Sequence, residues 1–286
     1  MGRRQAGAGS GVSGRHPRVA PVAYHAGMQD RNGARELGLL VATLAVLGRF
    51  VTDVPLWVAA TLAVVVAAAG TASLLGELRP WRWPFDRVVL PALAAFAAMG
   101  TARLVDPVPW LAFAFVGSWL VVAWVVGLEI AASEVDGMNA RSTSARLGAF
   151  GLAFLGFAAI GGLVPAGLAG DGQPLTVAAF LATVALDVAI GGLAGYRIAA
   201  LRPHTPGEAI VAFYQYSMIL APVGVLVRVL ALPKLFGPAV LTLATYLVTS
   251  LRESEEPVRF NARLLEETAA LTVAGGLVIV VGLLAR

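Results

Sequence analysis

The sequence contains no cysteine, a single lysine (Lys234) and only three histidines. Without cysteine the chain has no disulfide, no thiolate nucleophile and no Cys-ligated zinc or iron–sulfur cluster. The histidines, His16, His25 and His204, lie outside the apolar runs described below, which argues against a haem or copper centre within those runs. We therefore predict no catalytic residue, no metal site and no cofactor.

Charged residues are also scarce. They make up 13% of the 286 residues, apolar residues make up 58%, and the mean hydropathy is +0.79. Soluble domains average about 25% charged residues, so this composition is not that of an ordinary soluble domain. The apolar residues gather into runs of about twenty, the length a helix needs to cross roughly 30 Å of hydrocarbon. The sequence predicts an integral membrane protein.

We predict an all-α, polytopic transmembrane helix bundle of about nine spans. The first and eighth runs are the weakest, because each has only seventeen residues and the first carries Arg49 near its end. Loss of either run would leave eight spans. The predicted spans lie near residues 36–52, 55–76, 88–105, 108–131, 146–169, 174–196, 209–228, 235–251 and 267–285.

Residues 1–35 contain no apolar run and are rich in Gly, Ala and Arg. This pattern predicts a disordered basic cytoplasmic tail rather than a signal peptide, and Met28 is an alternative start to Met1. Residues 36–286 then form the transmembrane helical domain.

The basic residues predict the orientation. With the N-terminus in the cytoplasm and nine spans, the C-terminus lies outside and most basic residues fall in the inner loops, as the positive-inside rule requires. The net charge of +4 is spread over these short loops, so we expect a lipid bilayer and no nucleic acid as partner. The excess of Arg, Ala, Gly and Val suggests a bacterial cytoplasmic membrane. Only five basic residues are left outside: Arg49, Arg103, Arg228, Lys234 and Arg286.

Asp187 lies in the middle of the sixth apolar run, where an unpaired carboxylate costs several kcal/mol. At steps of four residues, Thr183, Gly191 and Gly195 share its helix face. Small residues allow another helix to approach closely, so we expect Asp187 to point into the bundle.

No arginine is expected to pair with Asp187. Arg103 and Arg228 lie near the outer ends of their predicted spans, and Arg197 lies near an inner end. We expect these three side chains to extend to the lipid headgroups.

Other polar residues lie at a similar predicted depth, roughly 8 to 14 Å from the inner ends of their spans at 1.5 Å per residue. With Asp187 and Thr183 they form a predicted polar layer between spans six, seven and eight. One interpretation is a ligand-binding cavity in which Asp187 changes protonation; the favoured one is interhelical hydrogen bonding without further function. Pro222 is a candidate helix break nearby. The remaining members of the layer are Tyr214, Gln215, Tyr216, Ser217, Thr242 and Thr245.

Small residues recur at intervals of four in the fifth run: Ala158, Gly162, Ala166 and Gly170. Such a stripe promotes close helix packing, either within the bundle or in a homo-oligomer.

Three functional classes remain open. We favour a noncatalytic membrane component or assembly protein, because no acid is matched with a base or a metal ligand. One alternative is a small-solute or proton-linked transporter that uses Asp187. The other is a membrane enzyme that acts on lipid-linked substrates at the inner face through Glu129, Glu134 or Asp136.

Overall fold

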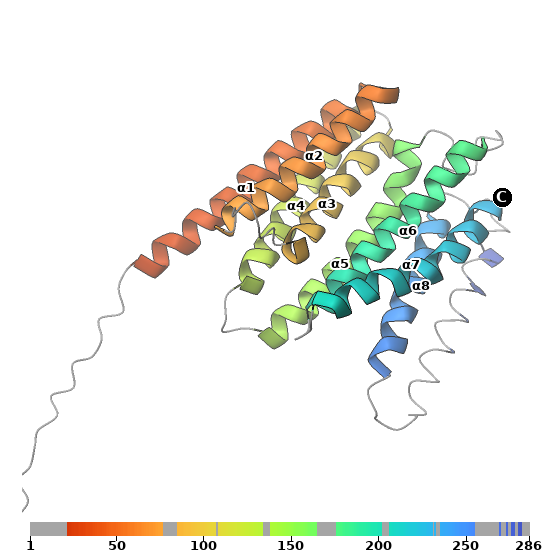
Figure 1. The fold of residues 1–286 in the computed structure, drawn as a ribbon. Helices are drawn as coiled ribbons and strands as arrows, with labels where there is room; N and C mark the ends of the chain where they lie inside the picture. The colour runs from red at the N-terminus through yellow and green to blue at the C-terminus, as the bar shows by residue number, and fades with distance from the viewer. Residues whose placement is uncertain are drawn as a thin grey trace, which may run out of the picture.

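The computed structural model describes residues 22–76, 85–106, 108–133, 138–164, 176–201, 206–230, 232 and 235–254, with six further positions between 269 and 281. Within these ranges every regular element is helical, which confirms the predicted all-α class (Figure 1). The elements are α1 (Val22–Gly48), α2 (Asp53–Leu74), α3 (Phe85–Leu104), the 3-10 turn η1 (Val108–Trp110), α4 (Leu111–Ser133), α5 (Met138–Leu163), α6 (Val177–Ala200), α7 (Pro206–Val229) and α8 (Phe236–Ser254).

Six of the described helices, α2 to α7, are long and apolar enough to cross a membrane. The predicted count of nine is therefore not confirmed. The helices α1 and α8, which correspond to the first and eighth predicted spans, fall short because α1 includes Arg31, Arg35 and Glu36, and α8 ends with Arg252 and Glu253. The ninth predicted span, 267–285, lies mostly outside the described residues.

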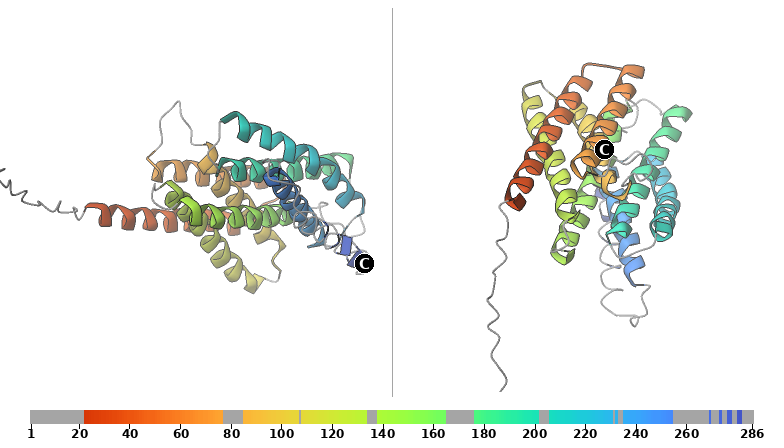
Figure 2. Two further views of the ribbon diagram at one scale, coloured as in Figure 1. Left: turned by 90° about the horizontal axis from the view of Figure 1, so that it is seen from below. Right: turned by 60° about the vertical axis from the view of Figure 1, so that its left-hand side comes forward.

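The helix α1 begins well before its predicted apolar run. Its first residue is Val22, so residues 22–35, which were predicted to belong to a disordered tail, are helical. The chain has no proline between Pro21 and Pro55 to stop the helix. Ala34 is buried, and the first turns of α1 project beyond the neighbouring helices (Figure 2). Residues 1–21 lie outside the described part of the chain.

The helices form two groups, α1 to α4 and α5 to α8, which meet along α3 and α5 (Figure 1). The helix α3 is central: it contacts α1, α2, α4, α5 and α6. Its closest approach to α5 is at a small residue, since a Cβ atom added at Gly100 would clash with the backbone of Ala159. The two helices therefore touch backbone to backbone, as small residues in membrane helices allow.

The same contact accounts for half of the small-residue stripe in α5. A Cβ atom added at Gly162 would clash with the carbonyl oxygen of Gly100, and Ala158 is buried. This half of the stripe packs within the chain. Ala166 and Gly170 lie outside the described residues, and a homo-oligomer through the stripe remains a prediction.

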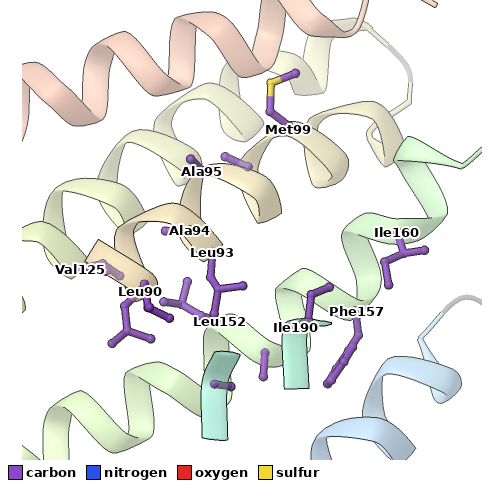
Figure 3. Close-up of a cluster of buried hydrophobic side chains, with 14 of the residues drawn as sticks. Leu90, Leu93, Ala94, Ala95, Met99, Val125, Leu152, Phe157, Ile160 and Ile190 are labelled. Carbon is purple, nitrogen blue, oxygen red and sulfur yellow. The ribbon is translucent and has the colours of Figure 1, made fainter. Parts of the chain in front are cut away.

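An apolar cluster ties the two groups of helices together (Figure 3). Buried side chains from four helices meet at the junction of α3 with α5, and α6 contributes Ile190 from the second group. The labelled members are Leu90, Leu93, Ala94, Ala95 and Met99 of α3, Val125 of α4, Leu152, Phe157 and Ile160 of α5, and Ile190 of α6.

Large apolar side chains also cover the outside of the bundle. Phe113, Leu120 and Trp124 of α4 are exposed, as are Leu181 of α6 and Met218 of α7. A soluble monomer rarely exposes apolar surface on this scale, whereas lipid-facing helices require it. The described helices thus have the surface of a membrane protein.

Candidate functional site

Asp187 is fully buried and forms an ion pair with Arg228 between α6 and α7. The Arg228 Nη2 atom donates to Asp187 Oδ1 at 3.0 Å and to Oδ2 at 3.1 Å, and Nε donates to Oδ2 at 3.1 Å. The side chains are 0% and 9% exposed. The prediction that Asp187 points into the bundle is confirmed; the prediction that no arginine pairs with it is wrong.

The direction of helical side chains explains the missed partner. A long side chain on a helix points back toward the N-terminus, over the preceding turn. Arg228 follows Gly224 by one turn, and a Cβ atom added at Gly224 would lie 3.4 Å from Asp187 Oδ2. The guanidinium therefore reaches deeper into the bundle than the position of Arg228 in the sequence indicates.

A second buried ion pair joins α4 to α6. The Arg197 Nε atom donates to Glu129 Oε1 at 2.9 Å, and Nη2 donates to Oε2 at 2.5 Å. Glu129 is 1% exposed and Arg197 is 4% exposed, so Arg197 does not extend to the headgroups as expected. The sequence did carry a signal for this pair, because α4 and α6 run in the same direction and both residues lie in the last turns of their helices.

The two ion pairs hold α6 on different sides. Asp187 and Arg197 lie ten residues apart, about 15 Å along the helix axis at 1.5 Å per residue. Asp187 faces α7, whereas Arg197 faces α4. Both pairs are bidentate and charge-assisted, the strongest hydrogen-bond arrangement between side chains. They fix the depth and the rotation of α6 in the bundle.

Arg103, at the end of α3, stabilises the C-terminal ends of two other helices. Its Nη1 atom donates to the carbonyl oxygens of Gly48 (2.9 Å), the last residue of α1, and of Val51 (2.7 Å) beyond it, and Nε donates to Gly162 of α5 (2.8 Å). These carbonyl groups lack intrahelical partners and carry a partial negative charge. The expectation that Arg103 extends to the headgroups is therefore wrong.

Arg49 makes the reciprocal contact from the end of α1. Its Nη1 atom donates to the carbonyl oxygens of Ala102 (3.2 Å) and Val105 at the end of α3, and Nη2 lies 3.3 Å from Asp106 Oδ1. Each of the two arginines thus caps the helix on which the other stands. Three helix C-termini, those of α1, α3 and α5, converge on this pair of cations.

The members of the predicted polar layer do not gather around Asp187. Tyr216 is buried and its hydroxyl lies 2.6 Å from Thr249 Oγ1, but Tyr214 and Gln215 are exposed on the outside of α7. Ser217 Oγ is buried without a hydrogen-bond partner in the described structure. The hydroxyl groups of three threonines donate to carbonyl groups of their own helices: Thr183 to Phe180, Thr242 to Pro238 and Thr245 to Leu241.

The register of α6 against α7 explains why the predicted polar layer does not gather around Asp187. The helices α6 and α7 pack through glycine, with Gly195 against the Tyr216 ring and Gly191 against Leu220. Tyr216 therefore lies level with Gly195, which is eight residues or about 12 Å from Asp187 along α6. Depth counted from the predicted span ends missed this offset, because it took the inner ends of the two helices as level. The end of α6 at Ala200 lies five residues beyond Gly195, whereas the start of α7 at Pro206 lies ten residues before Tyr216.

Pro222 does not break its helix. The helix α7 runs from Pro206 to Val229 with Pro222 inside it. Neighbouring helices in a membrane protein commonly compensate for the hydrogen bond that a proline removes.

The buried polar groups thus serve interhelical contacts more than they form an open site. In the ranges that the structure describes, no group of three or more His, Asp or Glu residues is placed to hold a metal ion. Both carboxylates that are buried in these ranges, Glu129 and Asp187, accept from arginine. Such an arrangement can link helices or exchange partners during a conformational change.

Fold, surface and buried ion pairs together define the class: an α-helical membrane protein. A comparison with protein-family models finds no matching family, and comparisons with curated proteins and with solved structures find no match.

Proposed function

We propose that the chain is a noncatalytic multi-pass component of a bacterial cytoplasmic membrane, with its buried ion pairs serving architecture. The observation that supports this most directly is that Asp187 and Glu129 are each engaged by a bidentate arginine. A general acid or base needs an accessible proton site, and an occupied, buried carboxylate does not provide one.

The burial and pairing of Glu129 also weigh against the alternative that the chain is a membrane enzyme. Glu129, one of its three candidate residues, is 1% exposed and paired with Arg197. Glu134 and Asp136 lie outside the described residues. A carboxylate that is held on both oxygen atoms is poorly placed to bind Mg²⁺ or a diphosphate.

We further propose nine spans, with the N-terminus inside and the C-terminus outside. The helix α1 has 27 residues and α8 has 19, which correspond to about 40 Å and 28 Å at 1.5 Å per residue. The length of α1 exceeds a bilayer core of about 30 Å, and the length of α8 is close to it. The charged residues of α8, Arg252 and Glu253, lie in its last turn. Those of α1 run from Asp30 to Glu36, and the apolar stretch that follows them begins at Leu37.

Transport is the second candidate, because a charged pair inside a membrane span often marks an ion pathway. A proton-linked transporter moves protons across the membrane and a noncatalytic component does not, so the rate of proton flux distinguishes the two candidates. We expect proteoliposomes with an internal pH-sensitive dye and an imposed pH gradient to lose the gradient no faster than protein-free liposomes. The measurement is the rate of dye response at matched protein density.

The control variants are Asp187→Asn and the exposed Asp106→Asn. A gradient loss that is faster with wild-type protein and with Asp106→Asn, but absent with folded Asp187→Asn, would establish transport and contradict the noncatalytic proposal.

A further inference from the structure

A narrow apolar crevice lies between α3 and α4, with α5 at its base. Its volume is about 210 Å³. The α3 wall includes Ala94, Ala98 and Val105, the α4 wall includes Gly117 and Val121, and Leu155 comes from α5. The crevice exists because the facing residues are small.

The crevice opens toward the lipid-facing side of α4. Gly117 is exposed, and a Cβ atom added there would have no neighbour within 4 Å. Phe113 and Leu120, on either side of Gly117 in the chain, are 69% and 56% exposed. Because α4 is one of the six helices suited to cross a membrane, hydrocarbon chains surround this opening.

The length of the crevice fits one leaflet. From Ala94 to Val105, α3 and the residue that follows it advance eleven positions, about 16 Å at 1.5 Å per residue. Half of a bilayer core of about 30 Å is close to 15 Å. Along α4 the lining runs only from Ala114 to Val121, about 10 Å, so the crevice accommodates part of one acyl chain within one leaflet.

A guanidinium group that does not itself line the crevice contacts the residue that ends its α3 wall. Arg49 Nη1 donates to the carbonyl oxygen of Val105, the last residue of the α3 wall. Arg49 Nη2 is 3.3 Å from Asp106 Oδ1, whose side chain is 83% exposed. An exposed ion pair of this kind contributes little, so an incoming phosphate can replace the carboxylate.

We propose that this crevice binds one anionic glycerophospholipid. One acyl chain occupies the space between α3 and α4, and the headgroup phosphate accepts hydrogen bonds from Arg49. The lipid completes the packing of two helices that leave a gap where small side chains face each other.

Native mass spectrometry of the purified full-length protein tests the proposal. Delipidated protein is titrated with phosphatidylglycerol and, separately, with phosphatidylcholine of the same acyl chains. We expect one bound phosphatidylglycerol per protein at lipid concentrations at which no bound phosphatidylcholine is detected. Gly117→Leu places a bulky side chain at the mouth of the crevice and should weaken this binding about tenfold, equivalent to about 1.4 kcal/mol.

Gly127→Leu is the matched control, since Gly127 is also on α4 and also has no neighbour within 4 Å of an added Cβ atom, but does not line the crevice. It should bind phosphatidylglycerol as the wild type does. Asp106→Asn, which removes the competing carboxylate, should bind it more tightly. Equal binding by Gly117→Leu and Gly127→Leu, or equal binding of the two lipids by the wild type, would overturn the proposal.

Discussion

Asp187 and Arg228 illustrate how a buried ion pair depends on both partners. Moving two charges out of water is costly, and their attraction repays this only when the geometry is good and the hydrogen bonds are satisfied. Loss of one partner leaves the other charge buried and uncompensated. Removal of one partner should therefore lower the free energy of unfolding more than replacement of both partners by apolar residues.

A double-mutant cycle tests this at the α6–α7 contact. We expect Asp187→Leu or Arg228→Met alone to lower the free energy of unfolding by about 3 to 5 kcal/mol, because each leaves a buried charge unpaired. The combination of both changes should cost far less than the sum of the two. Chemical unfolding in detergent micelles, followed by circular dichroism, measures all three variants.

The control for this cycle is Asp106→Asn, which removes an exposed carboxylate that faces Arg49. Exposed pairs contribute at most about 1 kcal/mol, so this variant should unfold almost as the wild type does. Additive effects of the two substitutions at the buried pair would show that Asp187 and Arg228 are not coupled.

The buried position of Asp187 was predictable, because a carboxylate that shares a helix face with Gly191 and Gly195 belongs at a close helix contact. Its partner was not predictable from depth alone. Arg228 belongs to another helix, and the reach of its side chain exceeds a full helical turn. The Glu129–Arg197 pair was within reach of sequence reasoning, since both residues stand near the ends of helices that run in parallel.

At the scale of the helix, glycine determines how closely α3 and α5 approach. Gly100 faces the backbone of Ala159, and Gly162 faces the carbonyl oxygen of Gly100. Backbone atoms cannot rotate away as a flexible side chain can. A methyl group at this contact therefore has to push the two helices apart.

Gly100→Ala should lower the midpoint of thermal unfolding, because overpacking of this kind typically costs about 1 to 3 kcal/mol. Gly151→Ala, on α5, is the matched change at a position where an added Cβ atom meets nothing within 4 Å. It should be neutral or stabilising by up to about 1 kcal/mol, since alanine favours a helix over glycine. An unfolding midpoint of Gly100→Ala at or above that of Gly151→Ala would exclude the backbone contact.

The positions of apolar helices were predicted from the sequence more accurately than those of helices that also carry polar segments. The predicted span at 108–131 corresponds to η1 and α4, and the span at 174–196 overlaps most of α6. Hydropathy locates such helices because the membrane requires apolar side chains along their whole length. The first half of α1 carries polar residues and extends beyond its apolar run, so hydropathy gave no signal for it.

At the scale of the whole molecule, the arrangement of helices is the part that the sequence could not supply. Helices such as α2 and α4 are apolar on every face, which is why hydropathy cannot tell which helix contacts which. The central place of α3 follows from its small residues and from the contacts of Arg103 with the ends of α1 and α5. These contacts join segments more than fifty residues apart in the chain.

Single cysteines test the proposed nine-span topology, since the natural chain has none to interfere. In intact cells we expect a membrane-impermeant maleimide to label Thr52→Cys and Ala285→Cys from outside. Ser13→Cys and Ser254→Cys should react only after the membrane is permeabilised, because nine spans place them in the cytoplasm. Gel-shift detection of the labelled protein reports each site.

Two results would contradict this topology separately. If Ala285→Cys required permeabilisation while Ser254→Cys did too, the ninth span would be absent. If Ser13→Cys and Thr52→Cys lay on the same side, α1 would not cross the membrane.

The order of the charged residues along the chain has a consequence for biosynthesis. Glu129 precedes Arg197 by 68 residues, and Asp187 precedes Arg228 by 41. As the ribosome delivers the protein to the membrane, each carboxylate arrives before the guanidinium that neutralises it. Insertion of α6 supplies Arg197 to Glu129, but it also adds Asp187, whose partner Arg228 has not yet been inserted. The nascent chain therefore carries an uncompensated acid from the insertion of α4 until α7 joins the bundle.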